Sequence, residues 1–143
     1  MLISTKGRYA LRVLIDMAEH QSEGHIPLKE IAERQEISEK YLESIVKELV
    51  RHSIVTGVRG KGGGYRLRKS PDRINVFDIL QIMEGTLSPV ACLEDGAMPC
   101  PRAAECRTLE FWQGLDEVIR SYASSRCLSD LMQKAEPGND YII

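Results

Sequence analysis

The sequence predicts a mostly α-helical protein with one small β-hairpin near its middle. Two observations predict this fold class. Apolar residues recur every three to four positions in five segments, which is the period of a helix with one buried face. Between residues 54 and 68, two short strand-like runs flank the glycine-rich turn 60–64. With 143 residues, 43% apolar and 28% charged, the chain is long enough to bury one core.

The first three helices are expected over residues 5–20, over residues 27–35 and from residue 38 onward. Pro27 suits the start of the second helix, where its missing N–H costs nothing. Ser38 can cap the third helix by accepting a backbone N–H. Three helices, a tight turn between the second and third of them, and a following hairpin together predict a winged helix-turn-helix domain. The buried stripe of the third helix is expected to be Leu42, Ile45, Val46 and Leu49.

The second half of the chain predicts a loop between two helices. A fourth helix is expected from its cap Asn75 to Gly85, and a long helix from about residue 108 to 124. The apolar stripe of the long helix is wide, so we expect it to pack against a second copy of the chain. The stripe contains Leu109, Trp112, Leu115, Ile119 and Tyr122, widened by Phe111 and Val118.

These elements divide the chain into four parts. Residues 1–85 form the winged domain, and residues 86–107 form a loop that contains cysteines. Residues 108–132 form a dimerisation helix with a C-terminal packing segment, and residues 133–143 form a flexible tail. No apolar run reaches the ~18 residues of a membrane span, and the N-terminus lacks signal-peptide features. We therefore expect a cytoplasmic protein.

The net charge of −2 conceals an uneven distribution. Residues 1–70 contain 13 Lys and Arg against 9 Asp and Glu, whereas residues 71–143 contain 6 against 12. This imbalance suggests that the first half meets a polyanion, although chance variation in a small domain can produce the same figures. The aromatic content of 6% argues against stacking on single-stranded bases as the main activity.

The glycine-rich turn does not match a nucleotide-binding motif. A P-loop needs Ser or Thr after its lysine, but Gly62 follows Lys61. A dinucleotide-binding fingerprint needs glycine at the position of Tyr65 and a helix afterwards, where a strand is expected. A plain hairpin turn does not require the four cations near it, so we expect a wing that contacts DNA, with Arg59 in the minor groove. The four cations are Arg59, Lys61, Arg66 and Arg68.

Polar residues occupy the N-terminal turns of the third helix, where a recognition helix meets the major groove. Lys40, Tyr41, Glu43 and Ser44 lie there. A carboxylate repels phosphate but can accept a hydrogen bond from cytosine N4, which gives Glu43 a reason to be present. Alternatively, this is a solvated face on which Glu43 pairs with Lys47 four residues later. The sequence alone favours neither interpretation.

Three of the four cysteines, Cys92, Cys100 and Cys106, lie within 15 residues of the predicted loop. In a reducing compartment, such a group is more often metal-binding or redox-active than disulfide-bonded. The gaps of seven and five residues are wider than those of structural zinc sites. They suit thiolates around an iron–sulfur cluster, which ordinarily needs four ligands.

The fourth ligand stays open. Cys127 stands apart and, beside Leu128, is expected to be a small buried hydrophobic residue in a helix. Glu105 and Glu110 are nearer candidates, as is a group from another subunit. The histidines are expected at the surface or at helix ends, and no set of nucleophile, base and acid is present, so we do not expect an enzyme. The histidines are His20, His25 and His52.

Three blocks of the sequence resemble one family of bacterial regulators, which includes IscR, NsrR, RirA and CymR. The blocks are STKGRYA at 4–10, ISEKYLE at 37–43 and VRGKGGGY at 58–65. The similarity extends to about residue 131. The resemblance implies a winged-helix DNA-binding domain, a long dimerisation helix, and homodimers that bind palindromic operators in double-stranded DNA. We expect neither a membrane partner nor a small-molecule substrate.

The resemblance also implies roles for individual residues. Tyr41 and Glu43 match base-reading positions, and Arg59 matches the arginine of the minor groove. The three loop cysteines match the cluster-ligating cysteines, which CymR-like members lack. Together with the residue patterns, this gives the expected DNA-binding set of Arg8, Ser38, Lys40, Tyr41, Glu43, Ser44, Lys47, Arg59 and Lys61.

Two positions depart from the family pattern. IscR-like members often have a histidine ligand where this chain has Leu109, and other members use an acidic residue where it has Arg8. Neither residue can ligate iron, so these positions leave the fourth ligand and the cluster type open. We favour a 2Fe–2S cluster, with a 4Fe–4S cluster as the alternative.

Three functions are compatible with these features. The first is a dimeric regulator whose operator affinity depends on the iron–sulfur cluster. The second is a metal-free thiol sensor, or a CymR-like regulator controlled by a partner protein. The third is an electron-transfer or metal-trafficking protein, against which the basic wing argues.

Overall fold

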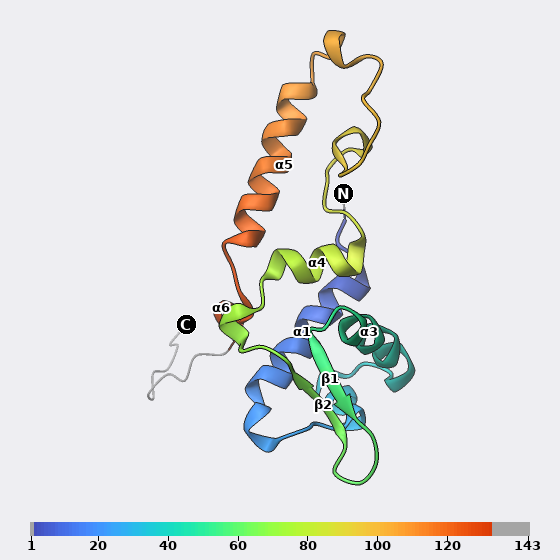
Figure 1. The fold of residues 1–143 in the computed structure, drawn as a ribbon, viewed down its shortest axis with the longest axis vertical. Helices are drawn as coiled ribbons and strands as arrows, with labels where there is room; N and C mark the ends of the chain where they lie inside the picture. The colour runs from blue at the N-terminus through green and yellow to red at the C-terminus, as the bar shows by residue number, and fades with distance from the viewer. Residues whose placement is uncertain (1, 133–143) are drawn as a thin grey trace, which may run out of the picture.

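Six α-helices and one two-stranded sheet make up residues 2–132, the part of the chain that the computed structural model describes (Figure 1). The expected fold class is confirmed. Single turns of 3₁₀ helix join some of these elements. The helices and strands are α1 (Thr5–Glu19), α2 (Leu28–Gln35), α3 (Glu39–Arg51), β1 (Val55–Val58), β2 (Gly64–Leu67), α4 (Val76–Glu84), α5 (Leu109–Ser124) and α6 (Leu128–Leu131).

Helix α1 lies at the centre of the body, where it contacts α2, α3, α4, α6 and β2. Its buried face repeats at helical spacing, and Val13, Leu14 and Met17 have no exposed surface. Ile45 of α3 and Ile79 of α4 complete the same core. The body therefore owes its structure to one apolar cluster contributed by most of its elements.

Side-chain caps fix where three helices begin. Ser4 Oγ accepts the Gly7 N–H at 3.2 Å at the start of α1, and Ser38 Oγ accepts the Tyr41 N–H at 3.2 Å at the start of α3. Asn75 caps α4 in the same way. Between α2 and α3, Glu36 adopts a left-handed conformation with φ of 54°, which produces the tight turn. The caps expected at Ser38 and Asn75 are confirmed; Pro27 precedes α2 as its N-cap.

The hairpin is tied to the segment before α2. β1 and β2 pair antiparallel from Val55 opposite Leu67 to Val58 opposite Gly64. Ile26 adds a third, one-residue pairing, exchanging two 2.8 Å backbone hydrogen bonds with Tyr65. A Cβ on Gly64 would lie 2.4 Å from the Ile26 carbonyl group, so only glycine allows this approach.

Helix α5 and the loop at 86–107 form an arm that projects from the body (Figure 1). No residue of α5 is buried, and α5 contacts the body mainly through α4. The chain then returns to the body at α6, where Leu128 is fully buried against the core. The tail predicted at 133–143 lies outside the described residues. No helix in the described part is long and apolar enough to cross a membrane.

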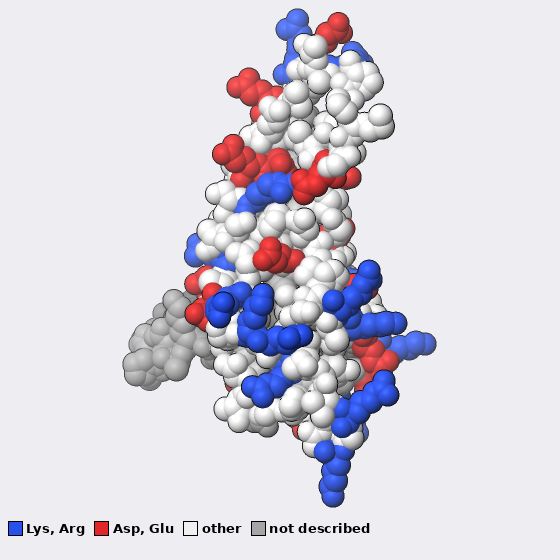
Figure 2. Space-filling view, viewed as in Figure 1, with Lys and Arg blue, Asp and Glu red and all other residues white. Residues whose placement is uncertain are grey.

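The two halves differ in surface charge. On the face in Figure 2, Lys and Arg gather over the winged body, whereas Asp and Glu are more frequent over the arm. The uneven charge along the sequence is therefore also a separation in space. The body is the part suited to a polyanion.

Candidate nucleic-acid interface and cysteine loop

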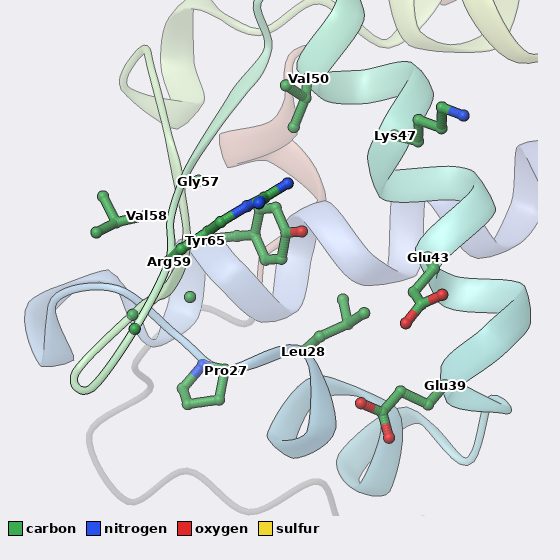
Figure 3. Close-up of a pocket in the computed structure, with 13 residues that line it drawn as sticks. Pro27, Leu28, Glu39, Glu43, Lys47, Val50, Gly57, Val58, Arg59 and Tyr65 are labelled. Carbon is green, nitrogen blue, oxygen red and sulfur yellow. The ribbon is translucent and has the colours of Figure 1, made fainter.

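A groove of about 690 Å³ lies between α3 and the hairpin (Figure 3). Glu43 and Lys47 of α3 line one side, and Arg59 and Tyr65 of the hairpin line the other. Arg59 and Tyr65 point from the hairpin toward α3 (Figure 3). The fold thus brings the predicted recognition helix and the predicted wing to one concave surface.

Three charged side chains of this groove form no ion pairs within the described chain. Among the described residues, no ion pair joins Glu43 to Lys47, and none involves Arg59. All three residues are exposed. The alternative of a Glu43–Lys47 pair is therefore not realised, and these groups are available to an external ligand.

Tyr65 supplies an apolar side to the groove, and its signal in the sequence was missed. A Cβ on Gly57 would lie 2.7 Å from the Tyr65 ring, so glycine opposite the tyrosine lets the ring lie across the strand. Strand alternation puts Tyr65 on the same face as the buried Leu67, which the sequence could have revealed. Arg66 lies on the opposite, exposed face.

Two of the predicted DNA-binding hydroxyls have structural partners. Ser38 Oγ caps α3, and Ser44 Oγ donates to the Tyr41 carbonyl oxygen at 2.6 Å. Tyr41 is half-buried, whereas Lys40 is exposed. Ser38 and Ser44 therefore shape the first turns of α3. The side chains that these turns present to a ligand are those of Lys40 and Tyr41.

Arg8 and Lys61 lie away from the groove lining. Arg8 is exposed on the first turns of α1, where its guanidinium donates to Thr5 Oγ1 at 3.2 Å. Lys61 is exposed at the tip of the wing. The sequence placed both in the DNA-binding set; the structure shows Lys61 in the turn whose Gly60 and Gly63 line the groove, and Arg8 on α1.

A buried carboxylate holds the first two helices together. Asp16 of α1 is 2% exposed and accepts two hydrogen bonds from Arg34 of α2, at 2.7 and 2.9 Å. Gln35 donates to the same carboxylate at 2.9 Å. Burial alone would raise the pKa of Asp16, but the hydrogen bonds and charge of Arg34, with the bond from Gln35, hold this pKa below its ordinary value. This fork fixes α2 against α1.

The cysteine loop presents its thiols to solvent. Cys92, Cys100 and Cys106 are free and exposed. The single turns 91–93 and 103–105 lie at different heights along the arm (Figure 1). Within the described residues, no three histidine, cysteine or acidic side chains converge as a metal site. The loop supplies soft donors, but the described chain does not assemble them.

Two cysteines have identifiable partners. Cys106 Sγ lies 3.6 Å from Thr108 Oγ1, and hydrogen bonding by Thr108 lowers the pKa of the Cys106 thiol. Cys127 is the N-cap of α6, with its Sγ 3.4 Å from Asp130 Oδ2. The expectation that Cys127 lies buried in a helix is wrong, because it is half-buried and precedes the helix.

Arg120 of α5 joins three elements at the base of the arm. Its guanidinium contacts Asp95 of the cysteine loop at 3.4 Å and Asp116 of α5 at 3.1 Å. It also lies over the ring of Phe77 in α4, 5.6 Å from the centroid. One side chain thus links the cysteine loop to the winged body.

The apolar face of α5 differs in detail from the predicted stripe. Phe111, Val118 and Tyr122 are 64%, 63% and 64% exposed, although the first two were expected only to widen the stripe. With Leu115 they form a line at helical spacing, and an open groove runs beside it. We call these four residues the α5 stripe. A face of this kind marks an interaction surface.

The geometry agrees with the comparisons to known proteins. The profile of the Rrf2 family, described as an iron-dependent transcriptional regulator, matches residues 3–134. The chain belongs to the Rrf2 family. The predicted resemblance to the regulators that include IscR and CymR is confirmed. The chain is thus a DNA-binding transcriptional regulator, and its relatives confirm that it is not an enzyme.

Relatives named CymR and relatives named IscR are both similar to this Rrf2-family chain. CymR of Bacillus subtilis is 40% identical over 131 residues, covering 92% of this chain and 89% of CymR. IscR of Xenorhabdus nematophila is 36% identical over 136 residues, covering 95% and 82%. The structure of B. subtilis CymR, titled a global cysteine regulator, superimposes with a TM-score of 0.75 at 38% identity, covering 92% of this chain and 95% of CymR. The structure of T. potens IscR superimposes with a TM-score of 0.73 at 34% identity, covering 92% of this chain and 85% of that IscR.

Proposed function

We propose that this protein is a homodimer that binds palindromic operators, with α3 in the major groove and the hairpin in the minor groove. The observation that carries the proposal is the groove between α3 and the hairpin, in which Glu43, Lys47 and Arg59 have no ion-pair partner among the described residues. A regulator of this kind acts in the cytoplasm, where its DNA is.

In this proposal the residues have distinct roles. Glu43 accepts a hydrogen bond from cytosine N4, and the Tyr41 hydroxyl contacts a neighbouring base. Arg59 enters the minor groove, where the negative potential is concentrated. The exposed cations outside the base-reading set meet phosphates and set the salt dependence of binding. These cations are Arg8, Lys40, Lys47 and Lys61.

The α5 stripe is the proposed dimer interface. Phe111, Val118 and Tyr122 project from a helix that has no buried residue within one described chain. Packing two such helices against each other buries this apolar surface. A two-fold axis there would relate the two α3 helices to each other, as binding to a palindromic operator requires.

Cys92, Cys100 and Cys106 are the proposed ligands of an iron–sulfur cluster. Their thiolates are the soft donors that such a cluster takes, and all three are exposed and free on one loop. Glu105 and Glu110 are exposed candidates for a fourth ligand. When bound, a 2Fe–2S or 4Fe–4S cluster supplies a centre that oxidants or iron scarcity can change.

Arg120 is the proposed route from the cysteine loop to the winged body. Ordering the loop favours the Asp95–Arg120 contact, whereas a free loop releases it. Because Arg120 also contacts Phe77 at the start of α4, the two loop states favour different positions of the arm on the body. The order of the loop would thereby shift the population of DNA-binding geometries, and a bound cluster would supply that order.

A metal-free thiol sensor is the second candidate function. The specific observation in its favour is Cys106, which is exposed and whose thiol pKa is lowered by Thr108. Thiolates react with oxidants, so a disulfide or sulfenic acid could replace cluster loss as the signal.

Two experiments test these proposals. A duplex is first selected from a random-sequence pool, and binding to it and to a scrambled duplex is titrated over a salt series. Arg59→Ala should weaken binding to the selected duplex by about 1–3 kcal/mol, and Glu43→Ala should relax discrimination at one base pair. Lys29→Ala, an exposed cation of α2 outside the groove, is the control. Wild-type affinity in both groove variants would show that this groove does not read DNA.

The cysteine loop is tested by anaerobic purification with visible absorption and iron and sulfide analysis. Replacing Cys92, Cys100 or Cys106 by Ala should abolish the chromophore, because iron loses a thiolate ligand. Cys127→Ser is the matched control and should keep it. A colourless wild-type protein without iron would favour the thiol sensor, and bleaching by Cys127→Ser would identify a four-cysteine site.

A further inference from the structure

We infer that Arg12 is a positioning residue for DNA recognition, which holds the end of α2 through Gln35 and the ring of Tyr41 through Tyr9. The inference rests on the proposed role of α3 as the recognition helix. Arg12 belongs to none of the predicted DNA-binding positions, and it lies on α1, outside the helix-turn-helix segment itself.

The first contact of Arg12 is with the C-terminus of α2. Arg12 Nε donates to Gln35 Oε1 at 3.2 Å, and a terminal guanidinium nitrogen donates to the Gln35 carbonyl oxygen. Gln35 is the last residue of α2, where carbonyl groups lack helical partners and the helix dipole is negative. Arg12 therefore caps α2 immediately before the tight turn that leads to α3.

The same two residues connect to the buried core of the helix-turn-helix. The Gln35 amide donates to Asp16, whose carboxylate also accepts the fork of Arg34. Gln35 is thus held against α1 by two residues one turn apart, the buried Asp16 and the exposed Arg12. Together these hydrogen bonds hold the C-terminal end of α2 in one arrangement against α1.

The second contact of Arg12 is aromatic. Its guanidinium carbon lies 4.9 Å from the centroid of the Tyr9 ring. The Tyr9 ring meets the Tyr41 ring edge to face, with centroids 5.8 Å apart and planes at 85°. Both rings are half-buried against the core, so the stack limits the orientations open to Tyr41.

These contacts converge on the first turn of α3. Tyr41 has its backbone N–H held by Ser38 and its ring held by Tyr9, so its hydroxyl is offered in a fixed direction. A side chain ordered before binding loses less entropy when it meets a base. Arg12 differs from Arg59, because its guanidinium already has partners within the chain. It therefore acts through Tyr41 and Gln35.

The test compares Arg12→Lys with Arg51→Lys on the selected and the scrambled duplex over a salt series. Lysine keeps the charge but lacks the planar fork that bonds Gln35 and lies on Tyr9. Arg12→Lys should lower the selected-to-scrambled affinity ratio about tenfold, with the scrambled affinity and the salt slope unchanged. Arg51, whose guanidinium is 3.6 Å from a Glu48 carboxylate oxygen at the exposed end of α3, is the matched control and should keep the ratio.

Other outcomes would overturn the inference. An Arg12→Lys protein with wild-type discrimination would show that only the charge matters. If, in addition, Arg12→Ala lowered the salt slope by about one, Arg12 would be a phosphate contact. A wild-type protein that selects no duplex would instead contradict the proposed DNA-reading surface, which separates the two failures.

The aromatic step has its own variants. Tyr9→Phe keeps the ring and should keep the affinity ratio, whereas Tyr9→Leu should reduce it about as much as Arg12→Lys. Because both act through Tyr41, the double variant should lose little more than either single one. Thermal unfolding verifies that each variant is folded. Independent, additive losses would contradict a shared route.

Discussion

Helices α1 to α4 of the winged body each contribute to one shared core, whereas α5 in the arm has no buried residue. In the cysteine loop at 86–107, Leu87 is buried and the thiols face solvent. The body is therefore specified by contacts within one chain. The arm leaves apolar side chains and thiols exposed in the described chain, as the proposed dimer interface and cluster site would require. Packing within one chain therefore accounts for the structure of the body but not for the exposed groups of the arm.

The largest expected effect lies in the body. Leu14→Ala removes a fully buried side chain from the centre of α1 and should lower the free energy of unfolding by about 2–5 kcal/mol. Leu115→Ala in the arm should cost the monomer much less, because Leu115 is only half-buried. Urea unfolding at low protein concentration measures both. Equal losses would mean that the arm is as tightly packed as the body.

The next effect separates the arm from the body. Val118→Asp places a charge in the α5 stripe and should weaken self-association by about 3 kcal/mol or more, because an unpaired charge would be buried. The body should stay folded, since Val118 is 63% exposed in one chain. Sedimentation measures the association. Gln113→Asp, an exposed residue on another side of α5, is the control, and equal dissociation by both variants would place the interface elsewhere.

Sequence periodicity predicted the body well and the arm less well. Helical spacing gave α1, α3 and α4 because one face of each helix is buried, so pattern and exposure agree. In α5 the pattern identified the apolar residues but placed Phe111 and Val118 at the margin of the stripe. Helical periodicity alone does not reveal which side of the helix packs against α4. The paired strands were predicted by their glycine-rich turn. The Ile26–Tyr65 pairing was not, because a single bridge leaves no repeat.

The candidate site shows the same limit. Glu43 and Arg59 were predicted because charge type and position suggest their chemistry. Arg12 was missed because neither of its contacts leaves a pattern in the sequence. Gln35 lies on another helix, and Tyr9 lies on α1 at ordinary helical spacing. Cys127 was misplaced because its neighbours are apolar, although its partner is Asp130.

A moderate effect is expected where the body is held by charge. The pKa of Asp16 is lower in the folded state than in the unfolded chain, so its ionised form contributes stability at neutral pH that is lost as the pH falls below about 4. Asp16→Asn should cost about 1–3 kcal/mol at neutral pH and flatten the loss of stability in acid. Urea unfolding at several pH values measures this. Glu30→Gln, an exposed partner of Arg34, is the control; an acid slope unchanged in Asp16→Asn would contradict the role of Asp16.

The smallest effect concerns the arm. Thr108→Val removes the hydroxyl that bonds Cys106, so the pKa of this thiol should rise toward its ordinary value. Less thiolate is then present at neutral pH, and alkylation of Cys106 in the metal-free protein should slow. Mass spectrometry follows the rate at each cysteine, with Cys100 as the internal control. An unchanged rate at Cys106 would mean that Thr108 does not activate it.

The proposed division between a DNA-binding body and a sensing arm is tested most directly by measuring the affinity for DNA in two states of the protein. The selected duplex is titrated anaerobically with protein reconstituted with iron and sulfide, and with the same protein after iron removal. We expect the wild-type affinities to differ by about tenfold or more, a coupling of ~1.4 kcal/mol, and those of Cys92→Ala to be equal. Equal affinities in a wild-type protein that does carry the cluster would contradict the account.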